Sequence, residues 1–195
     1  GRTAGLDFPG ESRGIVLTPD LWSGSTIGNI PIGQGIAVTP VQMAAAYAAI
    51  ANRGVWQAPY LVERIGTQNK RPKHGRRVVT VAVAAQLMVM LRDVVSAEGG
   101  TGAAAAVAGY TVAGKTGTAA KPDSRGGYSE SRYVASFVGI VPASSPRLVV
   151  LVTVDEPKGA IYGGVVAAPA FAEIARLGLQ NLEVDPDQRV VTSAG

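Results

Sequence analysis

Cysteine is absent from this chain of 195 residues, and histidine occurs once, as His74. The absence of cysteine excludes a disulfide framework and a cysteine nucleophile. A single histidine without cysteine also excludes most zinc sites and any catalytic triad that depends on a histidine base. We therefore expect no metal and no cofactor, and any chemistry must come from Lys, Ser, Thr, Tyr or carboxylate side chains.

Charged residues and long apolar runs are also scarce. Charged residues make up 16% of the chain and hydrophobic residues 47%, which indicates a globular domain with one sizeable core. The longest apolar stretch, residues 78–91, is shorter than the ~18 residues of a membrane-spanning helix and contains Thr80 and Gln86. No signal-peptide pattern opens the chain, so we expect a soluble domain.

Positive charge is concentrated in one place. The chain has 18 Lys+Arg against 14 Asp+Glu, and the run KRPKHGRR occupies residues 70–77. Such a run is typical of a solvated loop, and the alternative is contact with an anionic polymer or membrane surface. Because no aromatic residue interleaves with the basic ones, we expect no nucleic acid partner.

The first quarter of the chain combines an irregular segment with a clear helix start. Residues 1–37 are rich in Gly, Pro and Ser and predict a long irregular segment. Thr39, Pro40 and Gln42 then form the start signal of a helix that runs to Asn52. This helix has few polar positions, so we expect it to be buried on most sides.

The rest of the chain predicts two more helices and a group of strands. A helix over residues 80–96 carries an apolar stripe, in which Met88 and Met90 are expected to fill the core. A final helix is predicted over residues 168–181. Strands are predicted over residues 110–119, 133–141 and 147–155, the last two joined as an antiparallel hairpin.

The stretch GYTVAGKTGTAA, residues 109–120, fits two motifs that exclude each other. Residues 109–116 match the phosphate-binding pattern G-x-x-x-x-G-K-[ST], and the centre matches K-T-G. A phosphate loop needs a strand before it and a helix starting at its lysine. Here an alanine-rich stretch precedes it, and Pro122 and turn residues 123–127 follow. We therefore reject nucleotide binding and interpret the stretch as a strand.

A strand places these residues in a useful arrangement. Its two-residue period puts Lys115 and Gly117 on one face and Thr116 and Thr118 on the other. Two hydroxyls can bind a carboxylate, an ammonium adds positive potential, and glycine leaves room for another backbone. At the edge of a sheet, such a strand can also pair with a peptide-like substrate.

Several further motifs surround this strand in a fixed order. They are GQG at residues 33–35, VTPVQMA at 38–44, YAAIAN at 47–52, GKTGTA at 114–119, FVGIVP at 137–142, YGG at 162–164 and AAP at 167–169. With them the chain resembles the transpeptidase domain of class B penicillin-binding proteins along nearly its whole length. The ending, with DEP at 155–157 and LEVDP at 182–186, resembles the septal, cell-division members most.

The resemblance implies a mixed α/β fold of the α+β type, the penicillin-binding and serine β-lactamase-like fold. In it a five-stranded antiparallel sheet is sandwiched by helices, and three of the five strands are expected here. Residues 1–185 are then the C-terminal portion of the transpeptidase domain, and residues 186–195 are expected to be a disordered tail.

The resemblance also implies an activity. Its members are DD-transpeptidases that cross-link peptidoglycan stem peptides and are acylated by β-lactams. Lys115 is then expected to support electrostatics and a proton relay, while Thr116, Gly117 and Thr118 bind the substrate or antibiotic. The backbone N–H of Thr118 is expected to form half of the oxyanion hole.

Other polar and aromatic residues follow this strand in the sequence. Tyr128 and Tyr162 are expected to form an aromatic wall of the substrate site, the alternative being ordinary surface or packing tyrosines. Asp155 and Glu156 are interpreted as turn residues at the end of a strand.

No serine of the chain is followed by lysine in S-x-x-K or by asparagine in S-x-N. The family's serine nucleophile is therefore expected in a preceding segment of the same protein, here called the upstream half. This chain alone is expected to be inactive and to need that half for stability.

The resemblance further implies a place in the cell and alternative functions. Expected partners are stem peptides, β-lactams and cell-division proteins, on the outer side of a bacterial cell membrane with an anchor outside this chain. The alternative function is a non-catalytic module that senses muropeptides or β-lactams, and a serine β-lactamase is less favoured.

Overall fold

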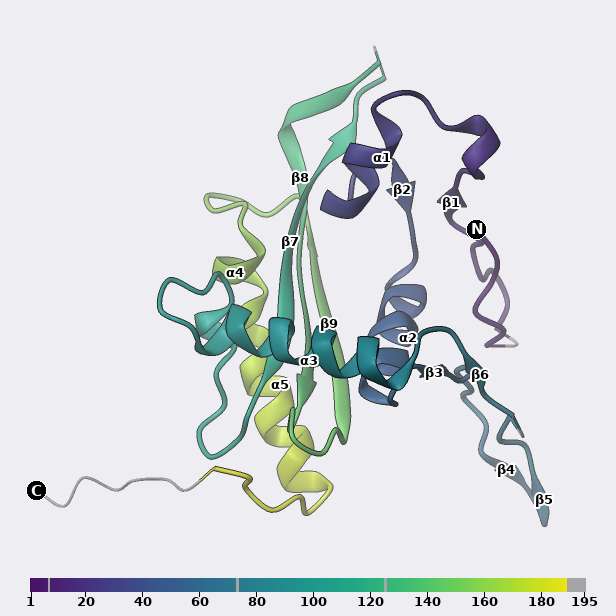
Figure 1. The fold of residues 1–195 in the computed structure, drawn as a ribbon, viewed down its shortest axis with the longest axis vertical. Coiled ribbons are helices and arrows are strands. Elements are labelled where there is room, and N and C mark those ends of the chain that lie inside the picture. The colour runs from purple at the N-terminus through teal and green to yellow at the C-terminus, as the bar shows by residue number, and fades with distance from the viewer. Residues whose placement is uncertain (7, 73, 125, 189–195) are drawn as a thin grey trace, which may run out of the picture.

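A three-stranded antiparallel sheet forms the centre of the molecule (Figure 1). The computed structural model describes residues 1–6, 8–72, 74–124 and 126–188. The strand order is β7-β8-β9, and the strands are β7 (Ala113–Pro122), β8 (Tyr128–Val141) and β9 (Leu148–Asp155). The predicted hairpin between the last two strands is confirmed, since Val141 is paired with Leu148.

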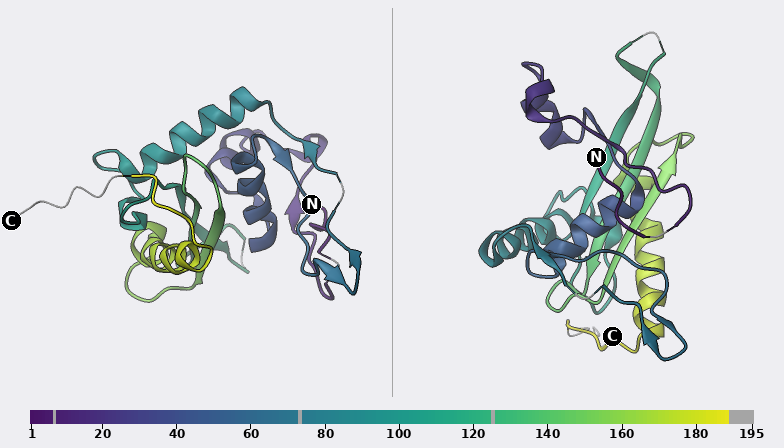
Figure 2. Two further views of the ribbon diagram at one scale, coloured as in Figure 1. Left: turned by 90° about the horizontal axis from the view of Figure 1, so that it is seen from below. Right: turned by 90° about the vertical axis from the view of Figure 1, so that its right-hand side faces the viewer.

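Helices cover both faces of this sheet, which confirms the predicted fold class. The covering elements are α2 (Pro40–Ala51) and α3 (Val81–Ser96) on one face, and η3 (Ala103–Ala105), α4 (Gly163–Val166) and α5 (Ala168–Asn181) on the other. Figure 2 shows α3 and α5 on opposite sides of the strands. Each face therefore has its own apolar cluster, one around Phe137 and Phe171 and one around Leu91 and Ile140.

The helix starts follow the sequence closely. Thr39 and Gln42 form a reciprocal capping box, in which the Thr39 N–H donates to Gln42 Oε1 at 2.7 Å and the Gln42 N–H donates to Thr39 Oγ1 at 3.2 Å. Thr80 caps α3 by accepting from the N–H of Val83 at 3.2 Å. Helix α5 spans the predicted residues 168–181. Local side-chain chemistry thus fixes where these helices begin.

Two predictions about helix burial are wrong. Only Ala45 and Ala49 of α2 are buried, although the helix was expected to be buried on most sides. Met90 of α3 is 63% exposed, whereas Met88, the other methionine expected in the core, packs against the cluster of Leu91. The apolar composition of both helices exceeds what the described residues cover, so apolar side chains remain at the surface.

The segment before α2 is largely irregular, as predicted. It contains short elements only: β1 (Ile15–Val16), η1 (Pro19–Leu21), α1 (Thr26–Asn29), η2 (Ile30–Ile32) and β2 (Ile36–Ala37), with β1 paired to β2. The carboxylate of Glu11 accepts hydrogen bonds from the N–H groups of Ala4, Gly5 and Leu6. Gln42 also donates to the carbonyls of Arg2 and Arg13, which ties the segment to α2.

The basic run lies in an arm that leaves the body of the molecule (Figure 1). The arm contains β3 (Val55–Trp56), β4 (Arg64–Ile65), β5 (Gln68–Asn69) and β6 (Arg76–Arg77), paired as β3-β6 and β4-β5. Its described basic side chains are exposed, as in a solvated loop. Within the described ranges, no helix combines the length and apolar character needed to cross a bilayer.

The chain after α5 packs back onto the segment just before β7. The Tyr110 hydroxyl donates to the carbonyl of Val184 at 2.6 Å. The Asp187 carboxylate accepts from the Thr111 N–H at 2.7 Å and from the hydroxyls of Thr111 and Ser144. This attachment reaches into the segment expected to be a disordered tail, of which residues 189–195 lie outside the described residues.

Asp187 should contribute stability that depends on pH. Burial alone would raise the pKa of Asp187, but the hydrogen bonds from Ser144 and Thr111 lower it. A lowered folded-state pKa adds stability above the unfolded value of about 3.9, and this stability is lost as pH falls through the folded value. Asp187→Asn should therefore cost about 1 kcal/mol at pH 7, a figure reduced because solvent screens this exposed carboxylate.

Thermal unfolding at pH 7 and near pH 3 tests this expectation. The difference in melting temperature between wild type and Asp187→Asn should be smaller near pH 3 than at pH 7. Asp185→Asn is the matched control, because Asp185 makes no side-chain hydrogen bond or ion pair with any described residue. A difference that is equal at both pH values would contradict the assigned role of the carboxylate.

Candidate active site

Strand β7 carries the K-T-G motif along one edge of the sheet. It pairs with β8 on one side, and among the described residues no strand pairs with its other side. Lys115 is exposed, and its Nζ donates to the Thr116 carbonyl at 3.0 Å. The same Nζ lies 3.4 Å from Thr116 Oγ1, so the ammonium is placed beside the first hydroxyl of the motif. An edge of this kind can pair with an extended peptide.

The two threonines of the motif lie on the same face of the sheet. Thr116 Oγ1 is 3.1 Å from Thr101 Oγ1, and Thr118 Oγ1 accepts from the Gly163 N–H at 3.3 Å. Thr101 comes from the loop before η3 and was not identified from the sequence. The sequence marks Thr101 only by the glycines around it, in Gly-Gly-Thr-Gly at residues 99–102, and this pattern does not indicate which residue Thr101 contacts. The Thr116 hydroxyl thus lies beside both the Lys115 ammonium and the Thr101 hydroxyl, and Thr118 adds a hydroxyl farther along the same face.

Glycines allow α4 to sit directly on this strand. A Cβ at Gly163 would lie 2.1 Å from the carbonyl oxygen of Ser136 and 2.6 Å from that of Gly117. A Cβ at Gly164 would lie 2.2 Å from the carbonyl oxygen of Thr101. Real Cβ atoms do not come so close to backbone, so only glycine fits at these positions. The YGG motif therefore serves a close backbone approach.

The structure places the two candidate tyrosines differently. Tyr162 is 64% exposed and directly precedes Gly163, which contacts Thr118. Tyr128 is 50% exposed and is paired with Pro122, four residues along β7 from Thr118. At ~3.3 Å per residue, this separation is about 13 Å. Tyr162 is therefore next to the motif, whereas Tyr128 lies farther along the hairpin.

An ion-pair cluster lies at the far end of the same strand. Lys121 Nζ is 2.6 Å from Asp155 Oδ1 and 2.9 Å from Glu156 Oε1. Hydrogen bonds to Asp155 and then Glu156 raise the pKa of Lys121, and burial opposes them. The two acids were interpreted as turn residues alone, and Lys121 was not singled out. The sequence holds no signal for this contact, because its partners are more than thirty positions apart.

The described residues give no support for a nucleotide-binding phosphate loop or for a metal site. Residues 113–122 continue as a strand through Lys115 and Thr116, so no helix begins where a phosphate loop requires one. No group of three potential metal ligands occurs within the described ranges. The rejection of a phosphate loop is therefore consistent with the fold.

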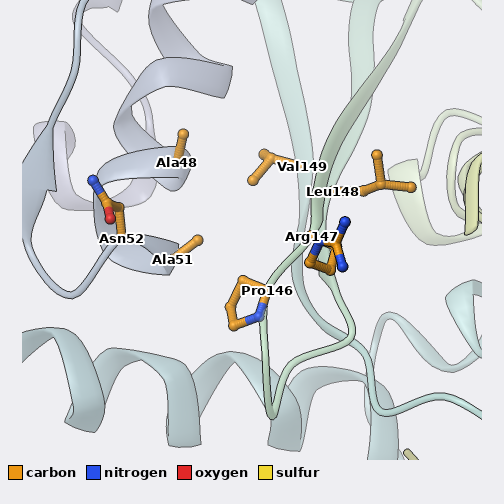
Figure 3. Close-up of a pocket in the computed structure, with 7 residues that line it drawn as sticks. All are labelled: Ala48, Ala51, Asn52, Pro146, Arg147, Leu148 and Val149. Carbon is orange, nitrogen blue, oxygen red and sulfur yellow. The ribbon is translucent and has the colours of Figure 1, made fainter. Parts of the chain in front are cut away.

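A pocket elsewhere in the molecule is not part of this site. It has a volume of about 210 Å³ and lies between the end of α2 and the β8-β9 turn (Figure 3). Most of its lining is apolar, and Asn52 and Arg147 are the polar exceptions. It opens beside β9, two strands away from β7. Its position makes it a feature of the opposite edge of the sheet.

Known proteins resemble the chain over almost its full length. Residues 1–176 match the family model described as penicillin binding protein transpeptidase domain. PbpB of Mycolicibacterium smegmatis is 41% identical over 96% of this chain and 31% of its own length. The peptidoglycan D,D-transpeptidase FtsI of Escherichia coli is 34% identical over 96% of this chain and 31% of its own.

A solved structure shows the same likeness in three dimensions. Penicillin-binding protein 3 of Mycobacterium tuberculosis, complexed with aztreonam, has a TM-score of 0.85 and 39% identity to the chain, covering 100% of this chain and 46% of that one. The likeness confirms the fold expected from the sequence. The chain spans about a third of the length of the curated relatives, 31% of each of the two above.

A substitution at Gly163 tests the close packing of α4 on β7. Gly163→Ala would force a methyl group against two backbone oxygens, which cannot move as a side chain does. We expect it to destabilise the protein by about 1 to 3 kcal/mol, the usual cost of overpacking. Gly28→Ala is the control, since a Cβ there would meet no described atom within 4 Å. Equal melting temperatures for the two variants would contradict this packing.

Proposed function

The chain belongs to the penicillin-binding protein transpeptidase family, and on that premise we propose that it supplies one wall of the active site of a peptidoglycan DD-transpeptidase. The upstream half supplies the serine nucleophile, in S-x-x-K, and the S-x-N motif. The complete enzyme cross-links stem peptides during septal cell-wall synthesis. The septal assignment is supported by the endings DEP and LEVDP, at residues 155–157 and 182–186.

The observation that carries this proposal is the grouping of an ammonium and hydroxyls on a sheet edge. Lys115 Nζ lies 3.4 Å from Thr116 Oγ1, which is 3.1 Å from Thr101 Oγ1. A carboxylate at this point accepts charge-assisted hydrogen bonds, which are stronger than neutral ones. The terminal carboxylate of a stem peptide and the carboxylate of a penicillin are the ligands that fit it.

The reaction then follows from the position of this carboxylate. With the carboxylate bound, the peptide backbone lies along the edge of β7 as an added strand. The serine oxygen of the upstream half attacks the carbonyl of the scissile bond, the terminal D-alanine leaves, and an acyl-enzyme forms. The Thr118 N–H stabilises the negative charge on that carbonyl oxygen in the transition state. An amine of a second stem peptide takes over the acyl group and restores the serine.

Lys115 has two roles in this scheme. Its ammonium holds the carboxylate by charge, and it raises the positive potential around the proton transfers of the upstream serine and lysine. Tyr162, exposed next to Gly163, forms an aromatic side of the substrate site. Tyr128 forms the outer part of that wall, because it is paired with Pro122, about 13 Å along β7 from Thr118.

The upstream half covers surfaces that the described residues leave open. Strand β9 pairs with β8 alone among the described strands, so its second edge accepts a strand from elsewhere. The pocket beside β9 lies at that same edge. Large apolar side chains are exposed in the first segment, namely Ile15, Leu21, Ile27 and Ile32. These features favour a chain that is stable only when the upstream half is present.

The proposal includes a location and further partners. The domain lies on the outer side of the bacterial cell membrane, held by an anchor outside this chain, and works with cell-division proteins. β-Lactams acylate the complete enzyme, as supported by the aztreonam and ampicillin complexes of the Mycobacterium tuberculosis relative.

Labelling with a fluorescent penicillin tests the division of the active site. The chain alone should give no covalent band on a denaturing gel, because it lacks the serine nucleophile. Mixed with the separately expressed upstream half, label should appear on that half. A band on this chain alone would contradict the proposal. No band in the mixture or in the complete protein would favour the non-catalytic sensor of muropeptides or β-lactams.

Substitutions in the K-T-G strand test the carboxylate site within the complete protein. Lys115→Met and Thr118→Val should each lower the second-order rate constant of acylation by about 10- to 100-fold, the range for a lost hydrogen bond to a charged group. Thr67→Val, in the exposed turn of the arm, is the matched control and should acylate normally. Acylation of both site variants at the wild-type rate would exclude β7 from the site.

A further inference from the structure

The loop between β9 and α4, residues 156–162, is attached to β7 at both of its ends. At its far end, the Gly163 N–H donates to Thr118 Oγ1 at 3.3 Å. At its near end, Lys121 binds Asp155 and Glu156. The loop carries Tyr162 and leads from β9 to α4, which packs on β7 and β8, so its path depends on these two attachments.

The Lys121 contact reaches across an intervening strand. Asp155 is paired with Val134 of β8, which is paired with Ala119 of β7. The side chains of Lys121 and Asp155 together therefore bridge about two strand spacings of ~4.8 Å each. It is only 25% exposed, and a single ammonium holds both carboxylates. One side chain of β7 thus holds both the end of β9, at Asp155, and the start of the loop, at Glu156.

The start of the loop is a turn that needs such support. Glu156 has a φ of 49°, in the left-handed region that non-glycine residues rarely adopt. Its N–H donates to the Tyr133 carbonyl at 2.9 Å, and its carboxylate is bound by Lys121. The backbone bond and the ion pair together keep the turn in one conformation. Without the lysine, the two carboxylates would repel each other at the point where the loop begins.

We propose that Lys121 is a positioning residue, which holds the loop 156–162 and its Tyr162 against the K-T-G strand and so sets how tightly the site binds its ligand before acylation. The inference rests on the proposed function, since the ligand is a stem peptide or a β-lactam. It assigns Lys121 no contact with the reacting atoms. Its effect is therefore on binding, while the chemical step depends on groups that stay in place.

Stopped-flow acylation of the complete protein by a fluorescent penicillin separates these two quantities. Lys121→Met should raise the dissociation constant of the first complex by about fivefold, the upper end for an ion pair near the surface, with little change in the acylation rate constant. Lys121→Arg should restore binding, because it keeps the charge. Lys158→Met is the control, since Lys158 is exposed in the same loop and forms no ion pair with any described residue.

A double-mutant cycle shows whether Lys121 acts through Tyr162. If it does, Lys121→Met should have almost no further effect on binding in a Tyr162→Ala background. Additive effects, or wild-type binding by Lys121→Met, would overturn the inference while leaving the proposed function intact. Failure of the wild type itself to be acylated would instead reject the proposed function.

Hydrogen exchange gives a readout that does not depend on acylation. Amides of residues 156–162 should exchange faster in Lys121→Met than in wild type or Lys158→Met, because the loop loses its near attachment. Unchanged exchange in this loop would also overturn the inference. A rise in exchange throughout the protein would show general destabilisation and likewise speak against a positioning role.

Discussion

The contact between Phe137 and Phe171 fixes the sheet to the helices, and the functional strand depends on it. Both rings are fully buried, with centroids 5.0 Å apart. They fit only because two neighbours are glycine: a Cβ at Gly114 would lie 2.5 Å from the Phe137 ring, and one at Gly139 would lie 2.4 Å from the Phe171 ring. Phe137 is also paired with Thr116. The aromatic contact therefore holds α5 against the sheet at the level of the K-T-G motif, and cores packed this tightly pass on small displacements.

Features decided by neighbouring residues were predictable from the sequence. The capping box at Thr39 and Gln42 is a contact over three positions, and the sequence located it because both partners are visible in one short window. The shared face of Thr116 and Thr118 follows from the period of a strand alone. The resemblance to a known family then gave the fold and the order of the motifs. Burial was harder to predict, because the sequence of an apolar helix such as α2 does not reveal which elements cover it. Only two residues of α2 are buried here.

Features that join distant parts of the chain were not predictable. Thr101 lies beside Thr116 because α4 and the loop before η3 close on β7, and no local pattern marks that meeting. Lys121 finds Asp155 across β8, so its role depends on the register of three strands. The attachment of Asp187 to Thr111 has the same character, since a short polar tail is typical of disorder until its partner is known. In each case the missing information was tertiary.

The two lysines of β7 have different roles, since Lys121 binds carboxylates of the protein itself and Lys115 is proposed to bind the carboxylate of a ligand. Lys121 occupies both carboxylates at the end of β9, whereas Lys115 forms no ion pair with any residue that the structure describes. An acidic side chain within reach of Lys115 would compete with the carboxylate of a substrate, because both need the same ammonium. Asp155 and Glu156 lie outside that reach, because Asp155 is two strands away from β7 and level with Ala119, four residues along from Lys115. The ion pairs of Lys121 therefore order the loop that carries Tyr162, while the ammonium of Lys115, which has no described carboxylate bound to it, is available to an incoming carboxylate.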